Sequence, residues 1–131
     1  MRRKKLLDTY ALLAYLKKEA KFEKVKDLLS STEVHVLMNE INIGEAFYIL
    51  ARERGKEKAD YFIDTILPNL PIAHEANAFD DVLGAARIKA EYRLSYADCF
   101  AVQTAIKENA SLVTGDPEFK KVEKLVEIDW L

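Results

Sequence analysis

Four acidic side chains stand out because each lies in an otherwise apolar stretch of the sequence. They are Asp8, Glu45, Asp98 and Asp116. Glu45 is the only charge in residues 41–51, and Asp98 is the only charge in residues 94–106. A charged carboxylate is costly to bury unless it is paired or bound to a metal. Four such residues suggest a shared purpose, and binding of a divalent cation is the simplest one.

The electrostatic repulsion among four clustered carboxylates indicates that a cation should accompany them. Two carboxylates about 4 Å apart repel each other by roughly 4 kcal/mol at an effective dielectric near 20. A cluster of four would remove several kcal/mol from a total stability of about 5–15 kcal/mol. A cation would neutralise that repulsion, and an all-oxygen ligand set favours Mg²⁺ or Mn²⁺ over Zn²⁺. His35 and His74 have no ligand-spaced partner, so we interpret both as structural or solvated.

Asp8 and Asp116 also have a simpler interpretation as helix caps. Asp8 precedes a helix that begins at Thr9, and Asp116 precedes one that begins at Pro117. An aspartate at such a position accepts a backbone hydrogen bond that stabilises the helix by about 1 kcal/mol. The capping and metal-binding interpretations stay open for both residues.

Asp98 has the same capping alternative, whereas the alternative for Glu45 is a salt bridge. Asp98 fits a capping box with Ser95, which lies three residues earlier. Glu45 lies beyond the capping positions of its helix, and none of its neighbours at spacings of three and four is a cation. A salt bridge with Arg52, two turns away, is the alternative role for Glu45.

Length and composition predict a single globular domain spanning residues 1–131. Half of the residues are hydrophobic and 32% are charged, which is typical of a soluble protein with a proper core. Cys99 is the only cysteine, so an internal disulfide is impossible and a reducing compartment is expected. The net charge of −2 provides no overall basic field for nucleic acid, although a local basic patch can suffice.

The start of the chain superficially resembles a signal peptide, with a basic head and an apolar body. Asp8 interrupts the apolar run and no small-residue cleavage site follows, so we reject that interpretation. The sequence also lacks a run of about 18 apolar residues that could span a bilayer. We therefore expect a cytoplasmic protein without a membrane partner.

The chain alternates short β-like runs with longer helical ones. The expected strands cover residues 4–7, 33–37, a short run around Ile72, 112–114 and 126–128. The expected helices cover residues 10–16, 22–29, 41–52, 56–67, 75–92, 96–107 and a short one from Pro117. This alternation predicts an α/β domain with a mostly parallel sheet.

Ligands of open parallel sheets bind outside the carboxyl ends of the strands. Asp8 and Asp116 each follow an expected strand directly, so both belong to that edge. We expect Glu45 and Asp98 to lie in the first turns of helices that reach the same edge.

Four ordered segments resemble a known family. They are Leu6-Leu7-Asp8-Thr9, Asn42-Ile43-Gly44-Glu45-Ala46, Leu94-Ser95-Tyr96-Ala97-Asp98-Cys99-Phe100-Ala101 and Thr114-Gly115-Asp116-Pro117-Glu118-Phe119. In order and separation the set is similar to the PIN-domain ribonucleases, specifically the VapC-type toxins of prokaryotic toxin–antitoxin pairs. The resemblance covers essentially the whole chain.

The resemblance implies a three-layer α/β/α sandwich on a short, mostly parallel sheet. It also implies that the four acids form a catalytic metal site for Mg²⁺ or Mn²⁺, with Glu40 a second choice beside Glu45. Three polar residues match positions that support metal or water in that family: Thr9, Ser95 and Thr114.

The activity implied is metal-dependent hydrolysis of RNA phosphodiester bonds, leaving a 5′-phosphate and a 3′-hydroxyl. The partners implied are an RNA substrate, a cognate antitoxin protein and a second copy in a homodimer. Basic groups should rim the site, among them the group around Arg52, and several tyrosines have the chemistry to stack bases. Those tyrosines are Tyr10, Tyr15, Tyr48 and Tyr96.

Two other functions are compatible with parts of the sequence. A non-catalytic RNA- or protein-binding module of the same fold is one, although the presence of all four acids argues against it. A phosphatase with Asp8 as nucleophile is the other. Such enzymes need a second aspartate two residues later, where this chain has Tyr10.

Overall fold

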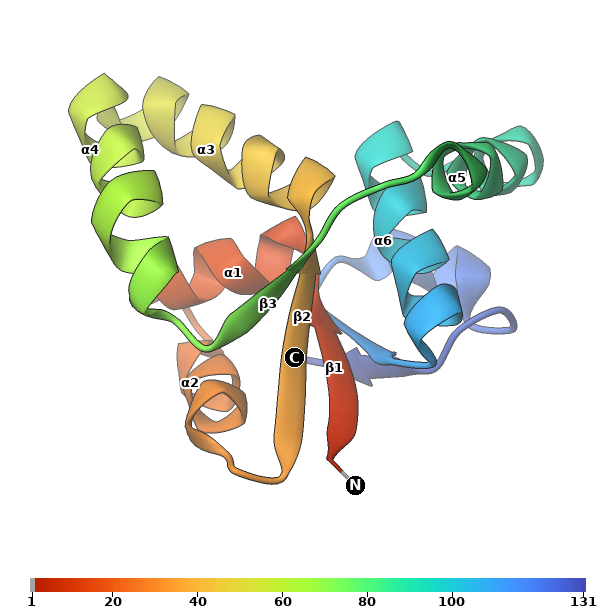
Figure 1. The fold of residues 1–131 in the computed structure, drawn as a ribbon, viewed down its shortest axis with the longest axis horizontal. Helices are drawn as coiled ribbons and strands as arrows, with labels where there is room; N and C mark the ends of the chain where they lie inside the picture. Colours follow the sequence, from red (N-terminus) through yellow and green to blue (C-terminus); the bar gives the residue numbers. More distant parts are fainter. Residues whose placement is uncertain (1) are drawn as a thin grey trace.

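The computed structural model describes residues 2–131 and is built on a central sheet of five strands (Figure 1). The strands are β1 (Arg3–Leu7), β2 (Val34–Asn39), β3 (Ile72–Glu75), β4 (Ser111–Thr114) and β5 (Ile128–Trp130). Their spatial order is β3-β2-β1-β4-β5, and every neighbouring pair is parallel. The predicted mostly parallel sheet is therefore confirmed, with β1 at its centre.

Helices cover both faces of the sheet, which gives the predicted three layers (Figure 1). One face carries α1 (Thr9–Leu16), α2 (Phe22–Ser30), α3 (Glu40–Arg54) and α4 (Lys56–Tyr61), and the other carries α5 (Phe79–Glu91) and α6 (Tyr96–Glu108). Adjacent side chains of one strand point to opposite faces. Accordingly, Leu7 belongs to the core under α1 to α4, and Leu6 to the core under α5 and α6.

Two expected elements begin two or more residues later in the structure. The helix expected over residues 75–92 begins at Phe79, because Glu75 pairs with Asn39 in the sheet. The Asp81 carboxylate then accepts a 2.8 Å hydrogen bond from the Ala78 N–H and closes the first turn. The last strand starts two residues later than expected, at Ile128.

The helix expected over residues 56–67 is interrupted. Beyond α4 the chain forms a π-helical turn, η1 (Phe62–Ile66), and a 3₁₀ turn, η2 (Leu67–Asn69). Pro68 explains the change, because proline cannot donate the backbone hydrogen bond that an α-helix would require there. None of the helices within residues 2–131 combines the length and apolar composition needed to cross a membrane.

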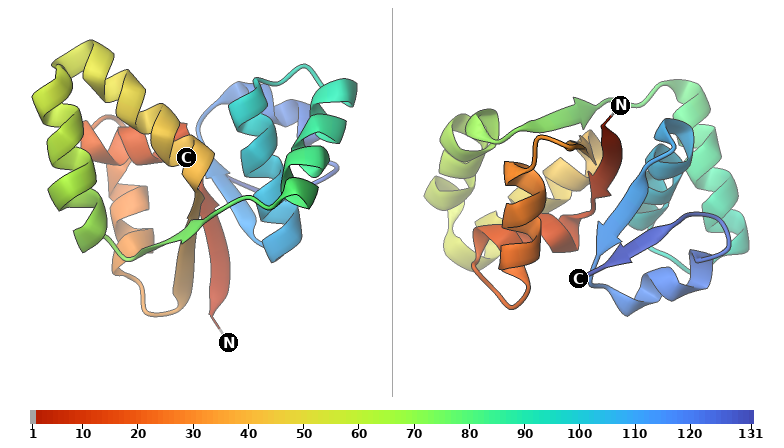
Figure 2. Two further views of the ribbon diagram at one scale, coloured as in Figure 1. Left: turned by 45° about the horizontal axis from the view of Figure 1, so that its top comes forward. Right: turned by 90° about the horizontal axis from the view of Figure 1, so that it is seen from below.

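The topology brings several helix starts to one edge of the sheet. Helix α3 begins directly after β2, with the Asn39 side chain accepting a 2.7 Å hydrogen bond from the Ile41 N–H. Helix α6 precedes the parallel strand β4, so it runs from the carboxyl edge back toward the amino edge (Figure 2). Both helices therefore place their first turns where β1, β2 and β4 end.

A buried lysine joins strands β1 and β5 across β4. The Lys5 ammonium donates to Asp129 at 3.1 Å, and Lys24 of α2 donates to the same carboxylate at 2.8 Å. Burial raises the pKa of Asp129, but the hydrogen bonds from Lys24 and Lys5 outweigh it and bring that pKa below its ordinary value. The cluster ties the last strand to the centre of the sheet.

We expect Asp129→Ala to lower the free energy of unfolding by about 1–3 kcal/mol, because it leaves the Lys5 ammonium buried without its carboxylate. Chemical denaturation at neutral pH measures the loss. Because the pKa of Asp129 is lowered on folding, the stabilisation from this pair is complete above the ordinary carboxyl pKa and is lost as the pH falls from there through the lowered pKa. The control is Glu53→Ala, which removes the half-exposed carboxylate of the Lys17–Glu53 pair and should cost less than about 1 kcal/mol. Equal losses of unfolding free energy for Asp129→Ala and Glu53→Ala would contradict a larger contribution from the buried pair.

Candidate active site

Asp8 is held at the end of β1 by hydrogen bonds to both of its carboxylate oxygens. Its Oδ1 accepts the Ala11 N–H at 2.8 Å, which makes Asp8 the N-cap of α1. Its Oδ2 accepts the Thr114 hydroxyl at 2.5 Å, and the side chain is buried. The predicted cap is confirmed, and the second hydrogen bond joins Asp8 to the end of β4.

Asp116 is linked to Asp8 through the same threonine. The Asp116 N–H donates to the Thr114 hydroxyl oxygen at 3.0 Å. The Asp116 carboxylate accepts the Glu118 N–H at 3.0 Å and caps the 3₁₀ helix η3 (Pro117–Val122). This cap is also confirmed, and Thr114 connects the two aspartates that follow the two adjacent strands.

Glu45 contacts the start of α1 from the neighbouring helix. The Thr9 hydroxyl lies 2.5 Å from Glu45 Oε1 and 3.2 Å from the Asn42 carbonyl oxygen. Because α3 begins at Glu40, Glu45 lies in the second turn rather than the expected first, and Glu40 is exposed. In residues 2–131 no ion pair joins Glu45 to Arg52, and the Arg52 guanidinium instead lies 5.1 Å from the Tyr48 ring centroid.

Asp98 lies in the first turn of α6, as expected. Ser95 is the N-cap of this helix and accepts the Asp98 N–H at 3.1 Å. The Asp98 side chain is half-buried. Each of the polar residues Thr9, Ser95 and Thr114 therefore contacts one of the four acids or its backbone.

The sequence interpretation missed Asn42, which joins the two helices that carry Glu45 and Asp98. Its side chain is fully buried, and its amide nitrogen donates to the Ala97 carbonyl at 3.0 Å. Its amide oxygen has no hydrogen-bond partner among the described residues. An asparagine three residues before Glu45 in an apolar run was the available signal, because buried amides normally serve a specific contact.

Electrostatic coupling shows that the acids share one environment. Burial is the largest influence on Asp8 and raises its pKa from 3.8 to about 7, against the hydrogen bonds from Thr114 and Ala11. The charges of Asp98 and Asp116 raise that pKa further. Two acids distant in sequence therefore act on the carboxyl group at the end of β1.

Burial and neighbouring acids also raise the pKa of Asp98. Burial raises its pKa from 3.8 to about 6, the Ser95 hydroxyl lowers it, and the charges of Asp116 and Glu45 raise it. Glu118 adds a smaller repulsion that the sequence interpretation did not include. Asp98 is thus coupled electrostatically to the other three predicted acids.

The site fits a hard cation in its chemistry, though its carboxylates do not converge on one point. In residues 2–131 no three side chains of His, Cys, Asp or Glu are close enough together to hold a metal ion. Asp8, Glu45 and Asp116 instead make separate hydrogen bonds with neighbouring groups. The donors are nevertheless all carboxylate oxygens, which suit Mg²⁺ or Mn²⁺.

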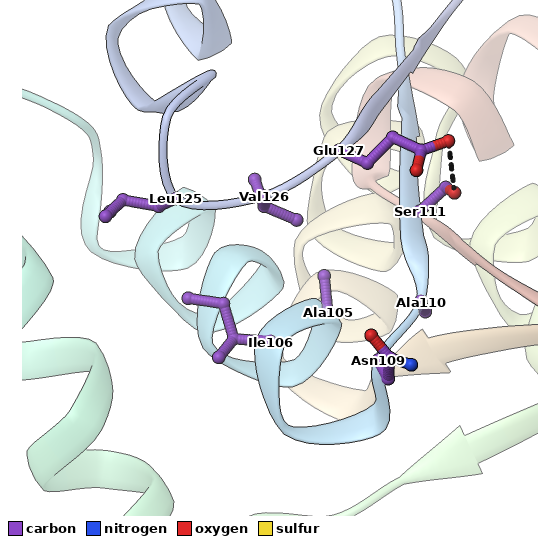
Figure 3. A pocket seen from close by; sticks show the side chains of 8 residues that line it. All are labelled: Ala105, Ile106, Asn109, Ala110, Ser111, Leu125, Val126 and Glu127. Atoms are coloured by element: carbon purple, nitrogen blue, oxygen red, sulfur yellow. Dashed lines mark hydrogen bonds between the residues drawn. The ribbon is translucent and has the colours of Figure 1, made fainter.

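A pocket at the opposite end of β4 has a different character (Figure 3). It lies between the end of α6 and the chain around Leu125, and its only carboxylate is Glu127. The Ser111 hydroxyl donates to that carboxylate at 3.2 Å. The acids at the carboxyl edge are therefore the better candidate for chemistry.

Sequence comparison identifies the class of protein that this fold and site define. The sequence model of the PIN domain matches residues 5–125. The chain therefore belongs to the PIN domain family. No curated protein gives a significant match to the sequence.

Solved structures share the fold at low sequence identity. VapBC2 from Rickettsia felis, bound to a DNA fragment from its promoter, is 19% identical with a TM-score of 0.75 and covers 98% of each chain. VapC20 from Mycobacterium tuberculosis, a toxin that cleaves the sarcin-ricin loop, is 17% identical with a TM-score of 0.73, covering 88% of this chain and 92% of its own. VapBC-1 from nontypeable Haemophilus influenzae is 20% identical with a TM-score of 0.70, covering 97% and 98%.

Metal-free protein should become less stable relative to Asp8→Asn as the pH rises from about 4 to about 8. Because the pKa of Asp8 is raised on folding, the folded protein binds that proton more tightly than the unfolded chain. The stabilisation is complete below the unfolded pKa and is lost as the pH rises through about 7. Urea denaturation in EDTA across this range measures the difference. The exposed Asp64→Asn serves as control, and a pH-independent difference for Asp8→Asn would refute the shift.

Proposed function

We propose that the protein is a divalent-metal-dependent endoribonuclease that hydrolyses RNA phosphodiester bonds at the carboxyl edge of its sheet. The main support is the electrostatic coupling of Asp8, Glu45, Asp98 and Asp116 in a chain that belongs to the PIN domain family. Buried carboxylates with raised pKa values are typical of functional sites. The four acids would be both the metal ligands and the catalytic groups.

The proposed site would hold Mg²⁺ or Mn²⁺ through these four acids, after Asp98 and Asp116 reorient toward Asp8. When bound, the metal would neutralise the carboxylates, bind the scissile phosphate and lower the pKa of a water molecule. Asp8 is oriented in advance, since both of its oxygens already accept hydrogen bonds.

The remaining residues would position the reacting groups. Thr9 fixes the Glu45 carboxylate, and Thr114 keeps Asp8 and Asp116 in register. Asp98 or Asp116 would accept a hydrogen bond from the attacking water and align it with the phosphorus. Hydrolysis would leave a 5′-phosphate and a 3′-hydroxyl.

We further infer that the protein is the toxin of a toxin–antitoxin pair in the cytoplasm. Structures that share its fold include VapBC complexes from Rickettsia felis and Haemophilus influenzae and a VapC toxin from Mycobacterium tuberculosis. Their fold extends over nearly the whole of this chain. A cognate antitoxin protein would then block the acidic site, and the toxin would act as a homodimer.

We expect RNA cleavage that requires Mn²⁺ or Mg²⁺ and stops in EDTA. Asp8→Asn and Asp98→Asn should each reduce the rate by more than the roughly 100-fold that loss of an outer-shell partner costs at metal sites. Gel analysis of RNA cleavage measures the rate, and circular dichroism verifies that each variant is folded.

Asp64→Asn is the matched control for this experiment, because Asp64 is an exposed aspartate in η1. It should cleave like the original protein. Equal cleavage by the Asp8 and Asp98 variants would indicate a contaminating nuclease, and RNA binding without cleavage would favour the non-catalytic module.

Mn²⁺ should stabilise the folded protein independently of any cleavage. A ligand that binds only the folded state at 100 times its Kd adds about 2.7 kcal/mol. We expect a gain of this order above pH 7, and its loss in Asp98→Asn. Thermal unfolding with and without Mn²⁺ measures the gain, and an equal gain in Asp98→Asn would place the metal elsewhere.

A further inference from the structure

Three half-exposed tyrosines lie within three residues of a candidate acid in the sequence. Tyr10 follows Asp8 by two residues, Tyr48 follows Glu45 by three, and Tyr96 precedes Asp98 by two. They are 47%, 45% and 45% exposed. Exposed aromatic rings beside a site for phosphodiester chemistry are suited to stacking on nucleobases, because every base has a π-face.

Tyr10 has the most closely defined position of the three. A Cβ atom added to Gly115 would lie 2.4 Å from Tyr10 Cε1 and 2.9 Å from Cζ. One side of the ring therefore rests against the backbone at Gly115, where only glycine leaves enough room. Gly115 itself lies in the sequence between Thr114 and Asp116, the two residues that extend the hydrogen-bond chain from Asp8.

The remainder of the Tyr10 ring is open to a ligand. Nearly half of the side chain is exposed, and the ring also borders a groove between α1 and α3. Packing on Gly115 already restricts the rotation of the Tyr10 ring. Stacking of a base on this ring therefore costs little additional side-chain entropy.

Helix α3 adds a cation on the same side of the site. Glu45, Tyr48 and Arg52 follow one another at spacings of three and four, so they share one face of the helix. The Arg52 guanidinium lies 5.1 Å from the Tyr48 ring centroid. An aromatic ring with an adjacent guanidinium provides stacking for a base and a contact for its phosphate.

We propose that Tyr10, held in place by Gly115, is a stacking platform that positions a base next to the scissile phosphate. Bases within a duplex are already stacked on their neighbours and cannot lie on the ring. The inference rests on the proposed ribonuclease function and adds a positioning residue to the proposed site.

Binding of oligoadenylate to the Asp98→Asn protein tests the platform without cleavage. Tyr10→Ala in this background should weaken Kd by about 10-fold or more, as expected when one stacked base loses its aromatic partner. Tyr10→Phe should restore Kd to within about threefold, because the ring remains. Fluorescence anisotropy of labelled oligoadenylate measures both, and the same strand paired with oligouridylate should bind weakly to every variant.

Gly115→Ala provides a second, independent variant. The added methyl group would displace the Tyr10 ring, so it should weaken Kd in the same direction. Combined with Tyr10→Ala it should add little, because the clashing ring is gone. The matched control is Tyr61→Ala, which removes a ring that is 57% exposed on α4, outside the elements that carry the acids. It should leave Kd unchanged.

An unchanged Kd for Tyr10→Ala would overturn the platform and would leave the ring as a contact for a protein partner. Additive losses of affinity for Tyr10→Ala and Gly115→Ala would also overturn it, because the two residues would then contribute to binding separately. Cleavage by the original protein tests the proposed function by itself. If the protein cleaves RNA but Tyr10→Ala leaves Kd unchanged, only this inference is wrong. If Tyr10→Ala weakens binding but no metal-dependent cleavage occurs, only the proposed ribonuclease function is wrong.

Discussion

Burial of a carboxylate at the carboxyl edge of a parallel sheet is the constraint on which the candidate site depends. Asp8 is buried at the end of the central strand, and burial together with Asp98 and Asp116 raises its pKa to about 7. An ionised carboxylate in such a place is unfavourable unless protons, hydrogen bonds or a cation compensate for it. The fold supplies the hydrogen bonds through Ala11 and Thr114.

The same hydrogen bonds give Asp8 and Asp116 a structural role beside the proposed chemical one. Asp8 caps α1 and Asp116 caps η3, as expected of aspartates that precede helices. These contacts fix the carboxylates at the strand ends without pairing them with a cation. Capping is therefore compatible with the proposed metal binding, because it orients the group that would bind.

The candidate site also depends on contacts between helices. Asn42 joins α3 to α6 through the Ala97 carbonyl, and Thr9 joins α1 to α3 through Glu45. Buried polar contacts of this kind are costly when incomplete, so they define the separation of the elements that they connect. The distance between Glu45 and Asp98 is in this way a property of helix packing.

The sequence by itself determined the alternation of strands and helices, the caps at Asp8, Ser95 and Asp116, and the residues able to carry charge at the sheet edge. These features depend on local periodicity and on side chains that reach their own backbone, so they are visible in short segments. Only the tertiary structure decided that Glu75 joins the sheet, that Asn42 bridges two helices, and that the Tyr10 ring rests on Gly115. Those contacts join residues far apart in the chain, and their geometry follows from how the helices pack on the sheet.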